Sequence, residues 1–310
     1  MKKIVNFLFL TFGFANLAFA ESFSTGSASI WQKSKFDKAD TFADGYAPMF
    51  INLQSGAAKT ALIALLATVI VFALHYFIFG PKRFSHLGKR ILAFNGFERF
   101  IHFIAAISWV VLLPTGLIML FGKTFGGEVA GICKTLHEFA TIGFAVAILP
   151  MFLMWVFKMF PTFYDIKWLV ILGGYLSKQK RPIPAGKFNA GQKIWFWVAM
   201  LGGGAMIASG AFMYFSDYNT ASTAQVAGMS GLEALRLTAL LHTAIGIVCI
   251  VFFCVHVYMS VFGVKGAISS MLNGYKDEEE VYLLHHYWYQ KLVKQGKIKP
   301  SNLEEKYKKL

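Results

Sequence analysis

Residues 237–262 read LTALLHTAIGIVCIVFFCVHVYMSVF, a stretch without Lys, Arg, Asp or Glu that is long enough to cross a lipid bilayer as a helix. It contains two histidines, His242 and His256, fourteen residues apart. Fourteen steps of about 100° come within about 40° of four full turns, so both imidazoles lie on nearly one helix face. At a rise of about 1.5 Å per residue they are about 21 Å apart along the axis, one toward each membrane surface.

The composition of the whole chain agrees with a membrane protein that crosses the bilayer several times. Of its 310 residues, 56% are hydrophobic and only 15% are charged, and the mean hydropathy is +0.53. A soluble domain carries about 25% charged residues. The net charge of +14 does not indicate nucleic-acid binding, because no basic stripe here belongs to a soluble fold.

Four further apolar segments, at 57–79, 100–122, 137–160 and 193–215, predict five spans together with 237–262. Lys and Arg are dense in 80–99, 161–192 and 263–310, whereas the loops 123–136 and 216–236 hold only Lys123, Lys134 and Arg236. Because positive charge gathers in cytoplasmic loops, we expect a multi-pass protein of the bacterial cytoplasmic (inner) membrane. Its mature N-terminus is then periplasmic and its C-terminus cytoplasmic.

The two ends of the chain carry signals of their own. Residues 1–20 have a basic start, an apolar stretch and the small-x-small site Ala18-Phe19-Ala20, as a secretory signal peptide does; an uncleaved first helix is the alternative. We expect 21–56 to be a periplasmic segment of little regular structure. For the cytoplasmic tail, 271–310, we expect a short amphipathic helix at the membrane surface.

Two more histidines lie at the ends of apolar spans, and ionisable groups there are functional candidates because burying them in lipid is costly. In the expected orientation, His137 and His242 lie toward the periplasm, and His102 and His256 lie toward the cytoplasm. Two neutral imidazoles can hold the two faces of a haem iron. The sequence therefore predicts two bis-histidine haem sites, and six-coordinate irons without an open position suit electron transfer.

Several other residues bear on these sites. Small residues near the expected ligands fit either a flat macrocycle or close helix packing: Gly116, Gly143, Gly210 and Gly246. The remaining histidines are expected not to be ligands: His75, His86, His285 and His286. Arg236 stands before His242 and either pairs with a haem propionate or anchors the helix end. No C-x-x-C-H motif occurs, so the haems are expected to be non-covalent.

Certain motifs resemble a known family. Residues 187–193 read KFNAGQK, and residues 240–246, 256–259 and 264–268 read LLHTAIG, HVYM and VKGAI. The tail motif LHHYWY, at 284–289, is similar as well. Together they resemble the formate dehydrogenase gamma subunit, a membrane cytochrome b with two b haems. The resemblance implies an all-α integral membrane fold, a four-helix haem-binding bundle over 96–270. An additional N-terminal transmembrane helix and a loop, 57–95, precede it.

The same resemblance implies the function and partners. It places the periplasmic-side haem at His137 and His242 and the cytoplasmic-side haem at His102 and His256, in agreement with the depths above. It implies a menaquinone pocket lined by Asn189, Ala190, Gly191 and Gln192, a stretch that otherwise reads as a helix start with Asn189 as N-cap. A periplasmic molybdenum or tungsten catalytic subunit would oxidise formate, and an iron–sulfur subunit would pass the electrons on. The chain itself has no site for formate.

Three alternatives remain at this stage. The cytochrome b subunit of a nickel–iron hydrogenase or thiosulfate reductase shares the four-histidine plan. A proton-coupled transporter also places histidines in the membrane, but the interrupted, repeated helices that such a protein shows are not evident here. A passive membrane anchor needs no histidines in line on one helix.

Overall fold

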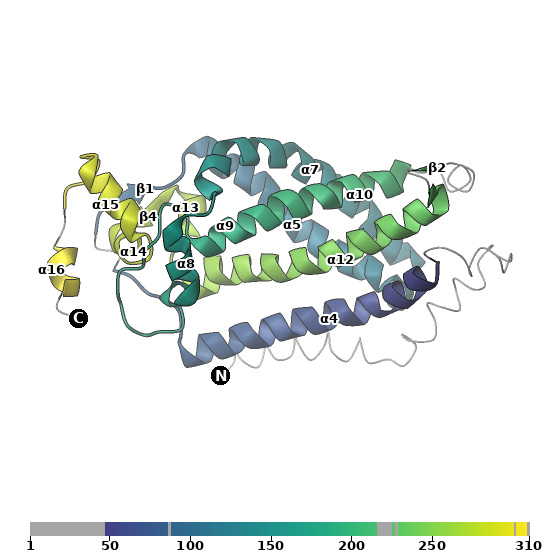
Figure 1. Ribbon diagram of the computed structural model, residues 1–310, viewed down its shortest axis with the longest axis horizontal. Coiled ribbons are helices and arrows are strands. Elements are labelled where there is room, and N and C mark those ends of the chain that lie inside the picture. The colour runs from purple at the N-terminus through teal and green to yellow at the C-terminus, as the bar shows by residue number, and fades with distance from the viewer. Residues whose placement is uncertain (1–46, 86–87, 216–224, 227–228, 301, 309–310) are drawn as a thin grey trace. The chain divides into compact units, whose positions relative to one another are not determined.

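The computed structural model describes residues 47–85, 88–215, 225–226, 229–300 and 302–308. The predicted signal peptide, residues 21–46 of the predicted periplasmic segment and His86 lie outside the described residues. The described chain is mostly helical, and five of its helices are long and apolar enough to cross a membrane (Figure 1). The predicted all-α membrane fold class is confirmed.

The long helices are α4 (Ala47–Ile78), α5 (Gly96–Leu120), α7 (Gly127–Met159), α9 (Ala190–Trp197) with α10 (Gly203–Phe215), and α12 (Gly231–Val257). A π-helical segment, η2 (Val198–Gly202), joins α9 to α10, and another, η3 (Tyr258–Gly263), extends α12. π-Helical turns are rare and often accompany functional sites.

Short elements fill the connections and the tail. The helices are α6 (Gly122–Phe125), α8 (Phe163–Val170), η1 (Leu172–Gly174), α13 (Ser269–Leu272), α14 (Glu278–Leu284), α15 (His286–Lys294) and α16 (Leu303–Lys308). The strands form two antiparallel pairs, β1 (Arg90–Leu92) with β4 (Tyr275–Asp277) and β2 (Gln225–Val226) with β3 (Met229–Ser230).

Two of the long helices begin about three turns before the predicted spans. Helix α4 starts at Ala47 instead of residue 57, and α7 starts at Gly127 instead of residue 137. Residues 47–56, expected to lack regular structure, are therefore helical, and His137 lies ten residues inside α7 instead of opening it. Polar residues ended the apolar window that predicted the span, but a helix does not need to stop where the hydrocarbon layer stops.

Capping boxes define the starts of three helices. Asn95 and Glu98 exchange backbone-to-side-chain hydrogen bonds at the start of α5, at 2.9 and 2.8 Å. Asn189 and Gln192 do the same at the start of α9, which confirms Asn189 as the N-cap. Thr162 and Asp165 close the start of α8. Each box satisfies amide groups that a helix start otherwise leaves without partners.

The outward faces of the long helices carry bare apolar side chains. On α5 a stripe at helical spacing is between 51% and 61% exposed: Phe97, Phe100, Phe103, Ile107 and Val110. A comparable stripe runs along α7: Phe139, Ile142, Val146, Leu149, Leu153 and Phe157. Large continuous apolar surfaces of this kind are uncommon on soluble monomers and suit contact with lipid.

The chain divides into two compact units, each made of pieces of several helices. Unit 1 comprises the described residues within Met1–Thr68, Val111–Phe139 and Gly202–Val251, and unit 2 comprises those within Val69–Val110, Ala140–Leu201 and Phe252–Leu310. His137 and His242 belong to unit 1, and His102 and His256 belong to unit 2.

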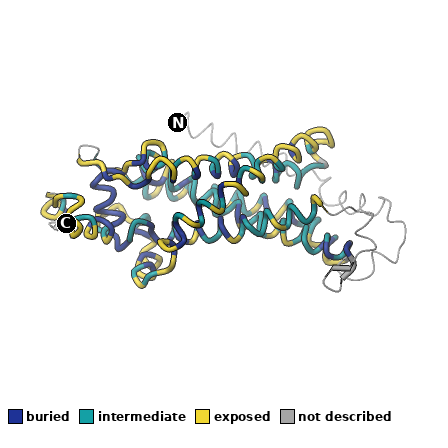
Figure 2. Tube along the Cα trace, turned by 90° about the horizontal axis from the view of Figure 1, so that it is seen from above, coloured by how far each residue is buried: buried dark blue, intermediate teal, exposed yellow. Residues whose placement is uncertain are grey.

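The tail folds within unit 2 in a way that the sequence did not reveal. Strand β4 pairs with β1, with Ile91 opposite Lys276, and every residue from 276 to 285 is buried (Figure 2). The acidic groups at 277–280 are buried because they have partners: Glu280 pairs with Lys276, and Glu279 accepts hydrogen bonds from the Ser85 amide and the Tyr307 hydroxyl. The predicted amphipathic helix corresponds to α15, but a strand and a buried helix precede it.

Candidate functional site

In unit 2, His102 of α5 and His256 of α12 face each other. Their ring centroids are 6.2 Å apart and the ring planes differ by 57°. An imidazole nitrogen lies about 2 Å from a metal that it ligates, and the ring centroid lies about 1 Å beyond that nitrogen. Two imidazoles on opposite faces of one iron therefore have centroids about 6 Å apart, which the observed separation matches.

Aromatic side chains surround the His256 imidazole. The indole of Trp195 stacks on it, with centroids 5.3 Å apart and planes at 18°. Trp109 in turn stacks on Phe253 at 5.5 Å and meets Trp195 edge-on at 5.2 Å. Within the described part of the chain, neither His102 nor His256 has a hydrogen-bond partner. These two rings are thus oriented by packing. Sequence reasoning missed Trp109 and Trp195, because aromatic residues are common throughout this chain.

In unit 1, the two predicted ligands are each anchored by a hydroxyl group. The Nδ1 atom of His137, on α7, lies 2.9 Å from Thr115 Oγ1 of α5. The Nδ1 atom of His242, on α12, lies 2.8 Å from Ser209 Oγ of α10. In both rings the atom that meets the hydroxyl is Nδ1.

The four glycines expected near the ligands separate into two groups. A Cβ atom on Gly116 would lie 3.3 Å from His137 Cε1, and one on Gly210 would lie 3.5 Å from His242 Cε1. These two glycines lie directly against the imidazoles. Gly143 instead makes room for the Ser108 hydroxyl, at 2.7 Å from such a Cβ, and Gly246 for the Met206 methyl, at 3.3 Å. These two therefore serve contacts between helices.

The chemistry of the donors also fits haem. Among the described residues, no group of three or more His, Cys, Asp or Glu side chains gathers as a metal site. His102 and His256, which face each other, are contributed by two different helices, and so are the predicted partners His137 and His242. Paired neutral nitrogens are the axial set of a six-coordinate haem, in which the porphyrin supplies the other four ligands.

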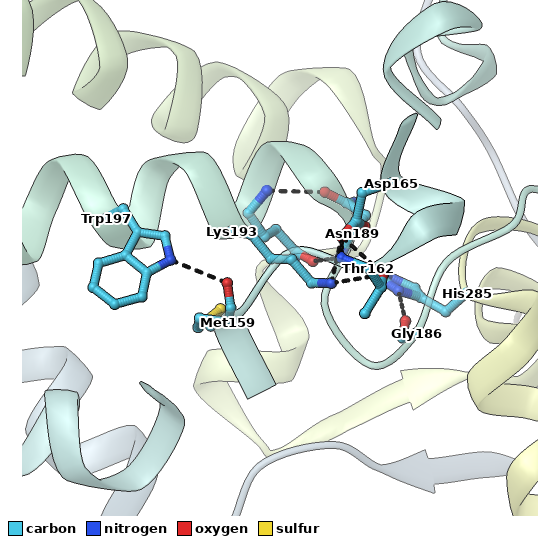
Figure 3. A network of polar contacts seen from close by, with 9 residues as sticks. Met159, Thr162, Asp165, Gly186, Asn189, Lys193, Trp197 and His285 are labelled. Carbon is cyan, nitrogen blue, oxygen red and sulfur yellow. Dashed lines mark hydrogen bonds and ion pairs between the residues drawn. The ribbon is translucent and has the colours of Figure 1, made fainter. Parts of the chain in front are cut away.

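The loop expected to bind a quinone forms the start of α9 (Figure 3). Asn189 Oδ1 accepts a hydrogen bond from the Gln192 amide, and Gln192 Oε1 accepts one from the Asn189 amide, both at 2.9 Å. The side-chain oxygens are therefore taken, and only the two side-chain NH₂ groups can donate to a further partner. Ala190 is buried, and Gly191 lets the Trp168 ring approach to 3.0 Å from where a Cβ would stand.

A buried ion pair adjoins this loop. Lys193 Nζ lies 2.6 Å from Asp165 Oδ2 and donates to Thr162 Oγ1 at 3.2 Å (Figure 3). The other oxygen of Asp165 is buried without a hydrogen-bond partner in the described chain. Lys187, nearby in sequence, lies 3.9 Å from Glu98 and over the Phe94 ring. Burial lowers the pKa of Lys187, although the charge of Glu98 opposes the shift.

The remaining histidines of the described chain and Arg236 contact other parts of the protein. His75 uses both ring nitrogens, toward the Tyr258 hydroxyl at 2.6 Å and the Tyr175 carbonyl at 3.1 Å. His285 and His286 bond to the backbone carbonyls of Gly186 and Tyr282. Arg236 is buried in α12, six residues before His242.

Membrane-length helices that present imidazoles in pairs define a membrane protein of the cytochrome b class. The chain belongs to the prokaryotic cytochrome b561 family, whose sequence profile matches residues 93–274, more than half of its length. Haem b is the cofactor that this family implies. Helix α4 lies outside the matched residues.

Curated relatives narrow the comparison. The chain is 28% identical over 223 residues to the cytochrome b556(Fdn) subunit of the nitrate-inducible formate dehydrogenase of Escherichia coli, covering 69% of this chain and 96% of that protein. It is 26% identical over 212 residues to the formate dehydrogenase cytochrome b556 subunit of Haemophilus influenzae, covering 66% and 84%. The predicted resemblance to formate dehydrogenase cytochrome b subunits is confirmed.

Proposed function

We propose that the chain is the membrane cytochrome b subunit of a respiratory formate dehydrogenase. It takes electrons from a periplasmic iron–sulfur subunit and passes them through two b haems to menaquinone near the cytoplasmic side. The formate itself is oxidised in a molybdenum- or tungsten-containing partner subunit. The observation that carries the proposal is that the imidazoles of His102 and His256 face each other with centroids 6.2 Å apart, in a chain whose relatives are named as such subunits.

Four side chains hold the cofactors in this proposal. His102 and His256 ligate the cytoplasmic-side haem, and His137 and His242 ligate the periplasmic-side haem. When bound, each haem supplies one-electron oxidation and reduction. The hydroxyls of Thr115 and Ser209 support the assignment of His137 and His242, because each contacts Nδ1, and a histidine that ligates a metal usually hydrogen-bonds through its other ring nitrogen. Arg236 is proposed to pair with a haem propionate.

The start of α9 is proposed to bind the quinone. Asn189, Ala190, Gly191 and Gln192 form a turn whose two side-chain NH₂ groups are not used in the capping box. Amide N–H groups are suitable donors to a quinone oxygen. The buried Lys193–Asp165 pair fixes this turn against α8 and gives the pocket a rigid wall.

Haem content tests the ligand assignment. In the purified complex, pyridine haemochrome analysis should give two b haems per chain. The His242→Ala and His137→Ala variants should each lose the same haem, and His102→Ala and His256→Ala should each lose the other, as identified by reduced-minus-oxidised spectra. The matched control is His286→Ala, since His286 is a half-buried histidine of the tail that bonds only to nearby groups. Retention of both haems in the four ligand variants would contradict the assignment.

Isosteric substitutions separate quinone binding from helix capping at Asn189 and Gln192. Asn189→Asp and Gln192→Glu keep the oxygen that caps the helix and remove the NH₂ donor. We expect formate-to-menaquinone electron transfer to fall at least tenfold in both, while the haem spectra and the thermal stability stay as in the wild type. Asn95→Asp, in the equivalent box of α5, is the control and should leave turnover unchanged. Unchanged quinol formation in both α9 variants would contradict the proposal that Asn189 and Gln192 bind the quinone.

The electron donor distinguishes the formate dehydrogenase from its alternatives. In membranes that contain the native complex, formate should reduce the haems of this chain within the dead time of rapid mixing. Hydrogen or thiosulfate chemistry should not involve it. If deletion of the gene abolished hydrogen oxidation and left formate oxidation intact, the chain would belong to a hydrogenase.

A further inference from the structure

The two imidazoles of unit 1 share a local arrangement that unit 2 lacks. Thr115-Gly116 on α5 faces His137, and Ser209-Gly210 on α10 faces His242. In each case a hydroxyl contacts Nδ1, and the glycine that follows it lies against Cε1 of the same ring. The same two-residue solution thus occurs on two helices, opposite two different histidines.

The hydrogens in this arrangement can be assigned. A hydroxyl has one hydrogen, and that of Thr115 is directed to the carbonyls of the preceding turn, at 2.7 Å from Val111 O and 3.2 Å from Leu112 O. The hydroxyl of Ser209 likewise donates to the carbonyl of Ala205 at 2.6 Å. Carbonyl oxygens can only accept. With its own hydrogen directed to a carbonyl, each hydroxyl accepts from the histidine, which places the imidazole proton on Nδ1.

The glycines bring the helix backbone close to the imidazoles. A Cβ atom at 116 would stand 3.3 Å from the imidazole carbon, which is tighter than ordinary contact, whereas one at 210 would stand at 3.5 Å, an ordinary contact. The neighbouring hydroxyls are only 2.9 and 2.8 Å from Nδ1, so the ring cannot move away without losing its hydrogen bond. Hydroxyl and glycine thus both meet the Nδ1–Cε1 edge of the same imidazole.

The ligand pair of unit 2 is held differently. His256 is stacked on Trp195, and within the described chain neither it nor His102 bonds through Nδ1. A hydrogen bond from Nδ1 makes an imidazole a more basic ligand and favours the more highly charged state of the metal. Ligands that differ in this way give two irons of the same type different reduction potentials.

We propose that Thr115-Gly116 and Ser209-Gly210 are positioning residues that fix the tautomer and ring plane of His137 and His242 and lower the reduction potential of the haem that they hold. The consequence is a built-in direction for electron flow, from the haem with hydroxyl-anchored ligands to the haem with stacked ligands. This inference rests on the proposed function, because it takes the four histidines as haem ligands.

Removing the hydroxyls tests the proposal in the intact complex. Thr115→Val and Ser209→Ala should each retain two haems per chain. In the periplasmic-side haem, the equilibrium between the ferric and ferrous states should shift at least tenfold toward the ferrous state. This corresponds to a rise of about 59 mV in its one-electron midpoint potential. Its low-spin electron paramagnetic resonance signal should shift as the imidazole planes relax. The other haem should be unchanged. Thr115→Ser, which keeps the hydroxyl, should restore the wild-type potential.

Two other helical hydroxyls supply matched controls. Thr68 donates to Ala64 O at 2.7 Å and Ser108 donates to Ile104 O at 2.9 Å, and neither contacts a histidine. Thr68→Val and Ser108→Ala should leave both potentials unchanged. If Thr115→Val and Ser209→Ala also left both potentials and the resonance signal unchanged, or if the controls shifted them equally, the proposal would be wrong. If His137→Ala and His242→Ala kept both haems, the failure would belong to the ligand assignment instead.

Discussion

His285 is a titratable residue that is buried within the folded tail. Its side chain is 2% exposed, its Nδ1–H donates to the Gly186 carbonyl at 2.9 Å, and its ring meets Trp288 edge-on. Burial, together with the charge of Lys276, lowers the pKa of His285 to about 3. The folded tail therefore holds a neutral imidazole, whereas the unfolded tail takes up a proton below its ordinary pKa of about 6.5.

The expected result is a loss of tail stability on acidification. Because the unfolded state binds more protons between about pH 6.5 and about pH 3, stability is full above that window and falls as the pH falls through it. Melting of the tail, followed by tryptophan fluorescence in detergent, should shift to lower temperature from pH 7 to pH 4.5, and His285→Asn should abolish this slope.

Glu279 provides the matched control for that window. Burial raises the pKa of its carboxyl, but hydrogen bonds from Ser85, Tyr307 and Lys306 outweigh burial and hold it at about 2. Its stabilising effect is present above about pH 4.3 and is lost only below it. Glu279→Gln should therefore preserve the slope between pH 7 and 4.5. A slope that disappeared in this variant and persisted in His285→Asn would contradict the assignment.

Which residues can be predicted depends on how distinctive their pattern is. The pairs of His102, His137, His242 and His256 followed from spacing and depth, because an imidazole in an apolar span is rare. Thr115 and Ser209 did not, because a helical hydroxyl in such a span equally well bonds to the preceding turn. The recurrence of a hydroxyl followed by glycine on two spans was the signal that could have found them.

Among the helices, α4 is held by a contact close to a proposed ligand. His75 donates through Nε2 to the Tyr175 carbonyl, so its Nδ1 accepts from the Tyr258 hydroxyl at 2.6 Å. Phe72 stacks on the same tyrosine ring, with centroids 4.2 Å apart. Tyr258 follows His256 by two residues and opens η3. The additional helix thus contacts the segment that carries a predicted haem ligand.

A double-mutant cycle measures this contact. Tyr258→Phe and His75→Phe should each lower the melting temperature of the purified protein, and the double variant should lose less than the sum of the two. Hydrogen bonds between membrane helices contribute about 0.6 kcal/mol on average and up to about 1.7 kcal/mol. Both haems should remain. The control is Tyr76→Phe, one residue along α4. Fully additive losses would show that the two side chains are not energetically coupled.

Hydropathy predicts the presence of the long helices better than their ends or the small elements. All five spans were found because a helix of twenty apolar residues has few alternatives. The β1–β4 pair and α14 were missed, because Asp277–Glu280 looks like a solvated run in the sequence. Its partners, Ser85, Lys306 and Tyr307, come from distant segments, and only folding brings them together.

For the molecule as a whole, the distribution of Lys and Arg predicts the orientation. The segments 80–99, 161–192 and 263–310 should face the cytoplasm. A protease site added after Leu310 should be cut in inside-out vesicles and protected in intact spheroplasts. Cutting in spheroplasts alone would show that the protein has the opposite orientation. The two haems would then lie on the opposite membrane sides from those proposed. A tag on a cytoplasmic protein serves as the control for leakage.

The whole-molecule function is only partly contained in one chain. Composition, span number and paired imidazoles indicate an electron carrier in a membrane, and they could be read from the sequence. The catalytic partner could be inferred only from resemblance, because a four-histidine bundle has the same local chemistry whichever soluble subunit delivers the electrons.

The continuity of α12 has one last consequence. His242 and His256 belong to a single uninterrupted helix, so the angle between their side chains is set by the number of residues that separate them. Adding or deleting one residue between them would rotate one imidazole by about 100° about the helix axis, away from the histidine with which it is proposed to share a haem. We therefore expect natural variants of residues 243–255 to differ in their side chains and never in length, because the number of residues in this stretch fixes both the spacing and the relative direction of the two imidazoles.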